Sequence, residues 1–283
     1  MKKNCFYTCL AMTALVALAA CKKEEPQVQP AHSFEVAPGS YVYFAPANLQ
    51  YQASGKIWRF AEHPYDISAT NANPTSTSSN WIDLFGWGTS GQNTGAVANM
   101  PYANSVTESD YYPGGSYSTD LAGDYACADW GKVQISNAGG SYDWRTPTAA
   151  EWNHLLTVRL HCDSLYTLAT VEKIPGLILF PDDWNFEYWS MVLKYQNKSY
   201  TDNKFDSALW SQMAEQGAVF LPASGQRLGD SLSDFKLSGC YWSSTHVGAY
   251  GAYFFGFSPK FLQPNASKGR RYGMSVRLIR PAR

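Results

Sequence analysis

Hydrophobic residues occur in short runs separated by long polar segments rich in glycine and serine. Short runs of β-branched and aromatic residues bounded by turn formers predict strands. Two opening strands, Tyr41–Phe44 and Ile57–Phe60, are expected to be joined through a turn at Ser54-Gly55. Later strands are expected at Leu177–Phe180, Ala218–Leu221, Tyr241–Ser244, Ala252–Phe257 and Met274–Ile279.

Two segments carry helix signals. Thr148 and Glu151 have the spacing of a capping box, and apolar residues recur at helical intervals from Trp152 onward. A second helix is expected through Trp210 and Met213, ended by Gly217 as a C-terminal cap. Two helices among many short strands and long loops predict an α+β domain.

The segment from His246 to Tyr272 mixes aromatic, small, basic and amide residues without a steady period, which favours a binding surface. In a strand over 253–257, alternation places Tyr253, Phe255 and Phe257 inward and Phe254 and Gly256 outward. In the last strand Met274, Val276 and Leu278 share one face. Arg277, on the other, is interpreted as a partly buried donor that pins loop carbonyls or a carboxylate.

Composition narrows the range of partners. The 283-residue chain has a formal net charge of −1, so nothing in its charge favours nucleic acid. Its aromatic share of 15% suits both a core and a recognition surface. After Cys21 only Cys127, Cys162 and Cys240 remain, so at most one disulfide can form and no metal spacing is present.

The amino-terminal residues predict where in the cell the protein is located. Lys2 and Lys3 precede a short apolar run that ends in Leu18-Ala19-Ala20-Cys21, which resembles a bacterial lipobox. Residues 1–20 are therefore expected to be a lipoprotein signal peptide and Cys21 to be lipidated; the alternative is an ordinary signal peptidase cut after Ala20. Residues 21–40 are expected to be a flexible tether, and residues 41–283 a single domain attached to the membrane only through the lipid.

The charged residues after Cys21 resemble the acidic export signal of surface-exposed lipoproteins in some Gram-negative bacteria. This resemblance predicts a location on the outer membrane, facing the outside of the cell; the alternative is a solvated linker that faces the periplasm.

One motif in the middle of the chain and two near its carboxyl end resemble those of a known family; we call the last two the closing motifs. Trp144–Trp152 resembles the strand-turn-helix signature of formylglycine-generating-enzyme-like domains, a branch of the C-type lectin fold. Gly239–Thr245 and Gly273–Leu278 resemble the closing motif of lipoproteins built on that fold, especially the variable proteins of diversity-generating retroelements. The resemblance covers most of residues 41–283. It implies a C-type-lectin-like fold with two main helices, short, mostly antiparallel strands and long loops.

The same resemblance implies a function. A lipid-anchored cell-surface protein would recognise a protein or glycan ligand on another cell, a phage or a host surface, through a binding segment within residues 240–279. The binding positions that the resemblance implies are His246, Val247, Gly248, Tyr250, Phe254, Gly256, Ser258, Phe261, Asn265 and Tyr272. The alternative is a glycan-binding surface lipoprotein that serves nutrient capture without sequence diversification.

The sequence supports an enzyme or a metal-binding protein less well than it supports a ligand-binding protein. Formylglycine-generating chemistry uses a pair of redox-active cysteines, and this chain offers Cys240 alone, so no enzyme is expected. Gln263-Pro264-Asn265 resembles the calcium-and-sugar tripeptide of true C-type lectins, but the partner Trp-Asn-Asp motif does not follow it. No cofactor is expected, and a structural calcium site remains an alternative to turn formation for five aspartates: Asp120, Asp124, Asp129, Asp182 and Asp183.

Overall fold

The computed structural model describes residues 29–92, 100–115, 119–140 and 143–282. Cys21 and the predicted signal peptide lie outside these residues. Within the described part of the chain, no helix combines the length and apolar character needed to cross a bilayer. The tether prediction needs one correction: Phe34 and Val36, inside the segment 21–40, are buried in a strand. Phe34 and Val36 alternate with Glu35 and Ala37, which is a strand pattern. The tether prediction was based on the charged residues 22–25 and wrongly extended to this strand.

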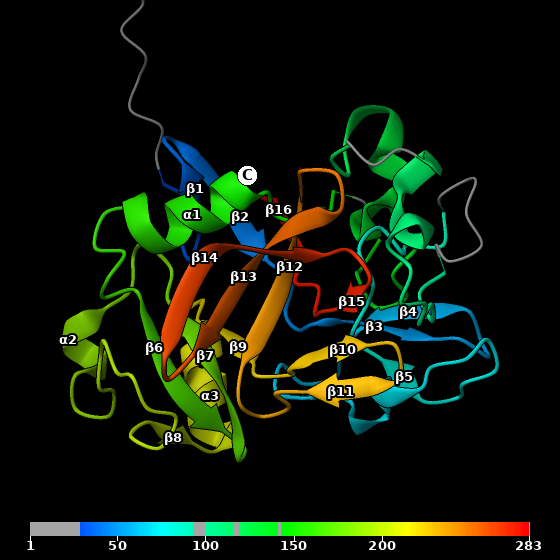
Figure 1. The fold of residues 1–283 in the computed structure, drawn as a ribbon. Helices are drawn as coiled ribbons and strands as arrows, with labels where there is room; N and C mark the ends of the chain where they lie inside the picture. Colours follow the sequence, from blue (N-terminus) through cyan, green and yellow to red (C-terminus); the bar gives the residue numbers. More distant parts are fainter. Residues whose placement is uncertain (1–28, 93–99, 116–118, 141–142, 283) are drawn as a thin grey trace, which may run out of the picture.

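The described residues form a mixed α+β structure of small, mostly antiparallel sheets with few helices (Figure 1). Only the pair β6–β8 is parallel among the strand pairs described. The sheets, each given in spatial order, are β1 (Phe34–Ala37), β2 (Ser40–Phe44) and β16 (Ile279–Pro281); β4 (Ile57–Phe60), β3 (Leu49–Gln52) and β5 (Trp81–Ile82); β8 (Lys204–Phe205), β6 (Tyr166–Val171), β7 (Ile174–Leu179) and β9 (Val219–Pro222); β11 (Ser231–Ser233), β10 (Gln226–Leu228) and β15 (Tyr272–Gly273); and β12 (Gly239–Val247), β13 (Gly251–Ser258) and β14 (Phe261–Gly269).

One helix start and one helix end lie where the local signals predicted them. Thr148 Oγ1 accepts from the Glu151 amide, and the Glu151 carboxylate accepts from the Thr148 amide, so the capping box is confirmed. Gly217 follows the second predicted helix with φ +87°, a left-handed conformation that favours glycine. The helices are α1 (Ala149–Asn153), which continues as the π-helical turn η6 (His154–Val158), α2 (Phe186–Trp189) and α3 (Ser207–Glu215); 3₁₀ turns occur at η1 (Ala69–Ala72), η2 (Glu108–Tyr111), η3 (Pro113–Gly115), η4 (Gly123–Ala128) and η5 (Trp130–Lys132).

The pairing of the opening strands differs from the prediction. β2 pairs with β1 and β16, whereas β4 pairs with β3 across the turn that contains Ser54-Gly55. The turn was predicted in the right place, but the strand on its amino-terminal side is Leu49–Gln52. β3 lies nearer to the turn than β2 does, and β3 forms the hairpin with β4.

The sheet β12–β13–β14 lies at the centre of the molecule, and its first two strands are covered on both faces (Figure 1). On one face Phe255 and Phe257 pack with Trp152 of α1 and the aliphatic residues of β6 and β7. On the other face Trp242 and Phe254 join a second apolar cluster. Burial on both faces explains the nearly continuous apolar run over 252–257.

The predicted strand Met274–Ile279 is instead an extended buried segment that contacts several sheets in turn. Its main chain exchanges hydrogen bonds with Phe85, Trp242 and Arg145, and only Ile279 belongs to a strand, β16. Arg277 is fully buried and donates to Asn48 Oδ1 at 3.0 Å and to the carbonyls of Ala45 and Phe220 at 3.0 and 2.7 Å. The interpretation of Arg277 as a pin for loop carbonyls is confirmed.

Candidate functional site: the carboxyl-terminal sheet

β14 is the long edge strand of the carboxyl-terminal sheet, and no local pattern predicted it. Pro264 interrupts it, which an edge strand tolerates because no neighbour needs its missing amide. Between the pairs Phe254–Ala266 and Gly256–Gln263 the register shifts, so β14 carries an extra residue at this point. The irregularity around Pro264 hides the strand period in the sequence.

A cavity of about 580 Å³ lies beside the end of the sheet where β13 turns into β14; we call it the hairpin cavity. Its walls come from β12, β13 and β14, from the segment 234–238 and from Tyr200. The residues that line it are Tyr200, Gln226, Asp234, Leu237, Ser238, Cys240, Phe254, Ser258, Pro259, Lys260, Phe261, Gln263 and Lys268. Three of these, Phe254, Ser258 and Phe261, are predicted binding positions.

Small residues make room for the hairpin cavity. A Cβ atom on Gly256 would lie 2.9 Å from Phe254 Cε2 and 3.4 Å from Phe261 Cε2, so a larger residue would crowd both rings. Cys240, paired with Gly256 across the sheet, is buried, and this burial raises the pKa of its thiol to about 11. At neutral pH this group is therefore an uncharged apolar part of the wall.

Polar side chains hold one side of the cavity in place. Lys268 Nζ donates to Gln226 Oε1 at 2.7 Å and lies 4.3 Å from the centre of the Tyr272 ring. Gln226 Nε2 in turn donates to Asp234 Oδ2 at 3.1 Å. The chain of contacts joins β14 to β10 and to the segment after β11, and it orients the Lys268 ammonium group over an aromatic ring.

The turn between β13 and β14 is a ridge with a hollow on each side. Ser258, Pro259, Lys260 and Phe261 line the hairpin cavity and also a second cavity of about 370 Å³ beside β6. Phe261 is 39% exposed at the end of this ridge. A partner can therefore contact this aromatic side chain from either hollow.

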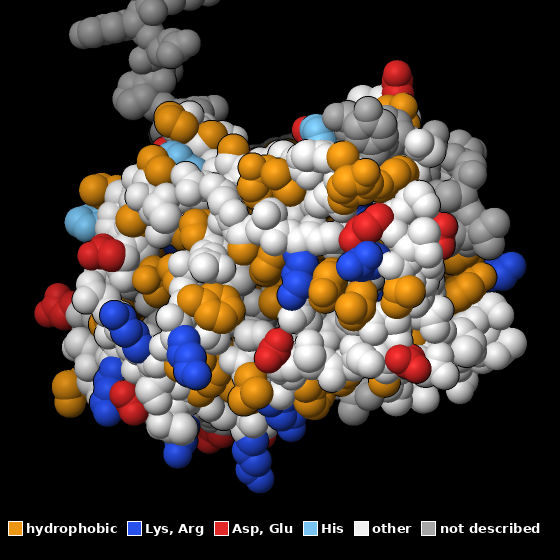
Figure 2. All heavy atoms as spheres, in the orientation of Figure 1, with side chains coloured by type: hydrophobic (Ala, Val, Ile, Leu, Met, Phe, Trp, Pro, Cys, Tyr) orange, Lys and Arg blue, Asp and Glu red, His pale blue; other side chains and the backbone are white. Residues whose placement is uncertain are grey.

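The other end of the β12–β13 hairpin carries four more predicted binding positions. Asp120 accepts hydrogen bonds from the His246 amide at 2.9 Å, and its Oδ1 lies 2.6 Å from His246 Nδ1. Gly248 has φ +54° and open space where a side chain would lie, and Tyr250 is 65% exposed. Val247 is half-buried beside them. The hairpin contacts the segment around Asp120 and Leu121. Hydrophobic and charged side chains are both exposed on the face of the molecule drawn in Figure 2.

The two remaining positions have structural contacts. With its amide oriented to satisfy its neighbours, Asn265 donates to the Ala149 carbonyl at 2.8 Å, at the start of α1. Tyr272 is half-buried, packs against the apolar cluster of Trp242 and lies under Lys268. Both side chains link the sheet to its surroundings.

The alternation predicted for β13 is confirmed, since Phe254 and Phe255 pack in different apolar clusters, but the predicted exposure of Phe254 and Gly256 is wrong. Phe254 is only 8% exposed and meets Trp242 edge to face, with ring centres 6.2 Å apart, and Gly256 is buried. The ten positions also do not form one surface, because the eight residues of β13, Gly251–Ser258, span roughly 25 Å. The structure brings together Phe254, Gly256, Ser258 and Phe261 around the hairpin cavity, and His246 to Tyr250 at the far turn.

Several residues of the cavity wall were not predicted. Gln226, Asp234, Leu237 and Tyr200 lie outside the closing motifs and reach the cavity only through the fold. Leu237 is 64% exposed and accepts a hydrogen bond from the Tyr200 hydroxyl through its carbonyl. No local pattern in the sequence links these residues to β13 and β14.

The aspartates proposed for calcium have other contacts. Asp129 is buried and accepts from the Gly131 and Thr146 amides, and burial raises the pKa of its carboxyl group. Asp182 and Asp183 lie in a turn, but their carboxylates accept from the distant amides of Glu35 and His32 and so hold the start of β1. Among the residues that the structure describes, no group of three or more His, Cys, Asp and Glu side chains lies close enough together to hold a metal ion.

Searches against protein families, curated proteins and solved structures found no match to this chain.

Proposed function

We propose that this protein is a lipid-anchored ligand-binding protein of the bacterial outer surface, and that it recognises its partner through the carboxyl-terminal sheet. The ridge Ser258–Phe261 and the hairpin cavity beside it are the proposed contact surface. The partner is a protein on another cell, a phage or a host surface, which inserts an apolar group beside Phe261.

The observation that carries this proposal is the hairpin cavity itself. Its volume of about 580 Å³ falls within the range of roughly 300–1,000 Å³ typical of ligand sites. Apolar walls from Phe254, Phe261 and Leu237 stand beside the polar groups of Lys268 and Gln263, the mixture of an apolar anchor and a polar rim that recognition surfaces use.

The cellular location and the finer fold belong to the same proposal. The lipobox-like residues before Cys21 support a lipid anchor, and the charged residues after it support display on the outer surface. The two longer helices, the mostly antiparallel strands and the long loops are compatible with the C-type-lectin-like fold that the closing motifs resemble. Labelling with radioactive palmitate in a Gram-negative host tests the anchor: the native chain should incorporate label, and Cys21→Ser should not.

A displayed peptide library tests the binding surface. A random peptide library on phage is selected against the unlipidated Cys21→Ser chain, and the enriched peptides are measured against Ser258→Trp by biolayer interferometry. Ser258 lines both hollows, so an indole here should weaken binding about tenfold or more, the equivalent of about 1.4 kcal/mol.

The control is Ser267→Trp, an exposed position on β14 away from the hairpin cavity, which should leave binding unchanged. Peptides that bind both variants as well as the native protein would contradict the proposed surface. A library that yields no binding peptide would do the same.

A further inference from the structure

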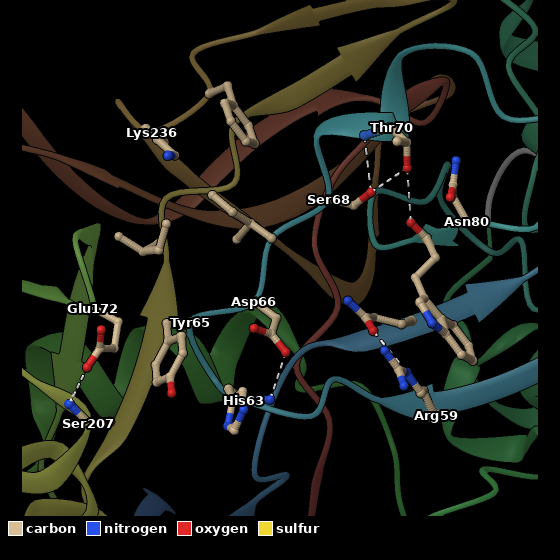
Figure 3. A pocket seen from close by; sticks show the side chains of 15 residues that line it. Arg59, His63, Tyr65, Asp66, Ser68, Thr70, Asn80, Glu172, Ser207 and Lys236 are labelled. Carbon is tan, nitrogen blue, oxygen red and sulfur yellow. Dashed lines mark hydrogen bonds between the residues drawn. The ribbon is translucent and has the colours of Figure 1, made fainter.

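Another, larger cavity, of about 900 Å³, is lined by no residue of β12, β13 or β14; we call it the Arg59 cleft (Figure 3). One side comes from β4 and the residues around β5 and η1, including Arg59 and Trp81. The other side comes from the β6–β7 turn, the start of α3 and the segment after β11, including Glu172 and Lys236. None of its lining residues belongs to the proposed recognition surface.

Arg59 is held in a fixed orientation. Its guanidinium carbon lies 3.7 Å from the centre of the Trp81 ring, and its Nε donates to Gln50 Oε1 at 3.1 Å. Among the described residues, its two Nη groups have no protein acceptor, so they remain available to a ligand. A stacked, oriented guanidinium loses little side-chain entropy when it binds.

Each of the two carboxylates of the cleft is oriented by a hydrogen bond from a backbone amide to one of its oxygens. Asp66 Oδ2 accepts from the His63 amide at 2.9 Å, and Glu172 Oε1 accepts from the Ser207 amide at 2.5 Å. The second oxygen of each carboxylate has no described partner. Glu172 has φ +47° in the two-residue β6–β7 turn, a conformation that favours Asn or Gly, so a glutamate here goes against the backbone preference.

Tyr65 adds a hydroxyl donor and an aromatic wall. Its ring stacks on His63, with ring centres 5.1 Å apart and an interplanar angle of 11°. Burial, followed by the charges of Glu172 and Asp66, raises the pKa of the phenol, so the hydroxyl keeps its proton at neutral pH.

The charges of the cleft cancel. Arg59 and Lys236 are positive and Asp66 and Glu172 are negative, and both signs are distributed around the opening rather than separated into two regions (Figure 3). Such a site presents both donors and acceptors but has no net attraction for an anion or a cation. Each hydroxyl group of a ligand can donate to a carboxylate and accept from a guanidinium, which a mixed set of this kind satisfies.

We propose that the Arg59 cleft binds an uncharged oligosaccharide, with sugar hydroxyls bound by Arg59, Asp66 and Glu172 and the apolar ring faces packed against the aromatic residues. Its volume suits more than one sugar ring and lies at the upper end of the range of about 300–1,000 Å³ for ligand sites. The two cavities share no lining residue but use the same segment: Phe235 and Lys236 line the Arg59 cleft, and Asp234 and Leu237 line the hairpin cavity.

Isothermal titration calorimetry tests this proposal on the full mature chain carrying Cys21→Ser. The probes are neutral trisaccharides and tetrasaccharides built from glucose, mannose, galactose or xylose, with zwitterionic dipeptides as the competing class. We expect at least one oligosaccharide to bind, and we expect Tyr65→Phe and Asp66→Asn each to weaken it about tenfold, the value of one good hydrogen bond to a charged or oriented group.

Asp66→Asn keeps an oxygen for the His63 amide, so the fold around it should be retained, and an unchanged Tm checks this. Asp124→Asn, an exposed change outside the cleft, is the matched control and should leave affinity unchanged. Ser258→Trp should also leave it unchanged, which separates this site from the proposed function.

Three results would overturn the proposal: no binding of any oligosaccharide, equal affinity of the native and cleft variants, or binding of the dipeptides alone.

Discussion

Two phenylalanines of the hairpin cavity should differ sharply in their effect on stability. Phe254 is 8% exposed and packs against Trp242, whereas Phe261 is 39% exposed on the β13–β14 ridge. Replacing a buried Phe with Ala typically costs about 3–5 kcal/mol. One edge of Phe254 borders the cavity, so water can enter part of the vacated space, and we expect about 3 kcal/mol.

The cost at Phe261 follows from its exposure. Full burial of a phenylalanine side chain is worth about 1.5–3 kcal/mol, and roughly three-fifths of this side chain is buried. We therefore expect Phe261→Ala to cost about 1–2 kcal/mol while it removes the proposed anchor and weakens peptide binding. Phe254→Ala should weaken binding as well, but only alongside a large loss of stability.

Urea unfolding followed by tryptophan fluorescence measures both values on the Cys21→Ser chain. The two substitutions remove the same atoms, so each is a control for the other. Equal losses of stability, or a larger loss for Phe261→Ala, would refute the assignment of Phe254 to the core and Phe261 to the surface.

Three further predictions concern buried polar groups. Arg277→Met leaves three acceptors in the core without a donor and should lower the free energy of unfolding by about 3–5 kcal/mol in urea; a loss under 1 kcal/mol would mean that the pin is dispensable. Burial raises the pKa of Asp83 from 3.8 to about 6, so the folded state binds this proton more tightly. Stability from this group should therefore fall as the pH rises between about 4 and 6, by up to roughly 3 kcal/mol, and the same pH dependence in Asp83→Asn would contradict this. Cys127 is exposed, whereas the thiol of Cys240 is buried with a pKa of about 11, so a disulfide reagent at pH 8 should modify Cys127 first; equal rates would show that the cavity wall is open.

Local signals predicted the helix ends at which capping residues occur. The capping box at Thr148 and the left-handed Gly217 each act within a single turn of helix, so the residues that fix the helix end are neighbours in the sequence. Strand positions were also found where apolar runs were short and bounded by turns, as in β7 and β9.

The misses have a common physical cause. The orientation of Phe254 follows from a second apolar layer, contributed by residues near Phe85 and Trp130, that no local pattern could show. β14 was missed because Pro264 and the register shift break its period. Partner choice for β2 depends on β16, more than two hundred residues later in the chain.

The candidate site was predictable only in part for the same reason. The predicted strand Ala252–Phe257 lies within β13, which ends at Ser258, but β14, which bears Phe261, was missed. The opposite wall comes from Gln226 and Leu237, which the fold brings to the cavity. The Arg59 cleft joins residues from widely separated parts of the chain, and none of the motifs predicted it.

The central claim is that ligands bind beside Phe261 in the hairpin cavity. Crystallographic screening with a library of small fragments tests this most directly, because each bound fragment reports its own position. We expect the fragments to collect in the hairpin cavity, in contact with Phe261 and near Lys268. Fragments that cluster elsewhere on the molecule and leave this cavity empty would contradict the claim.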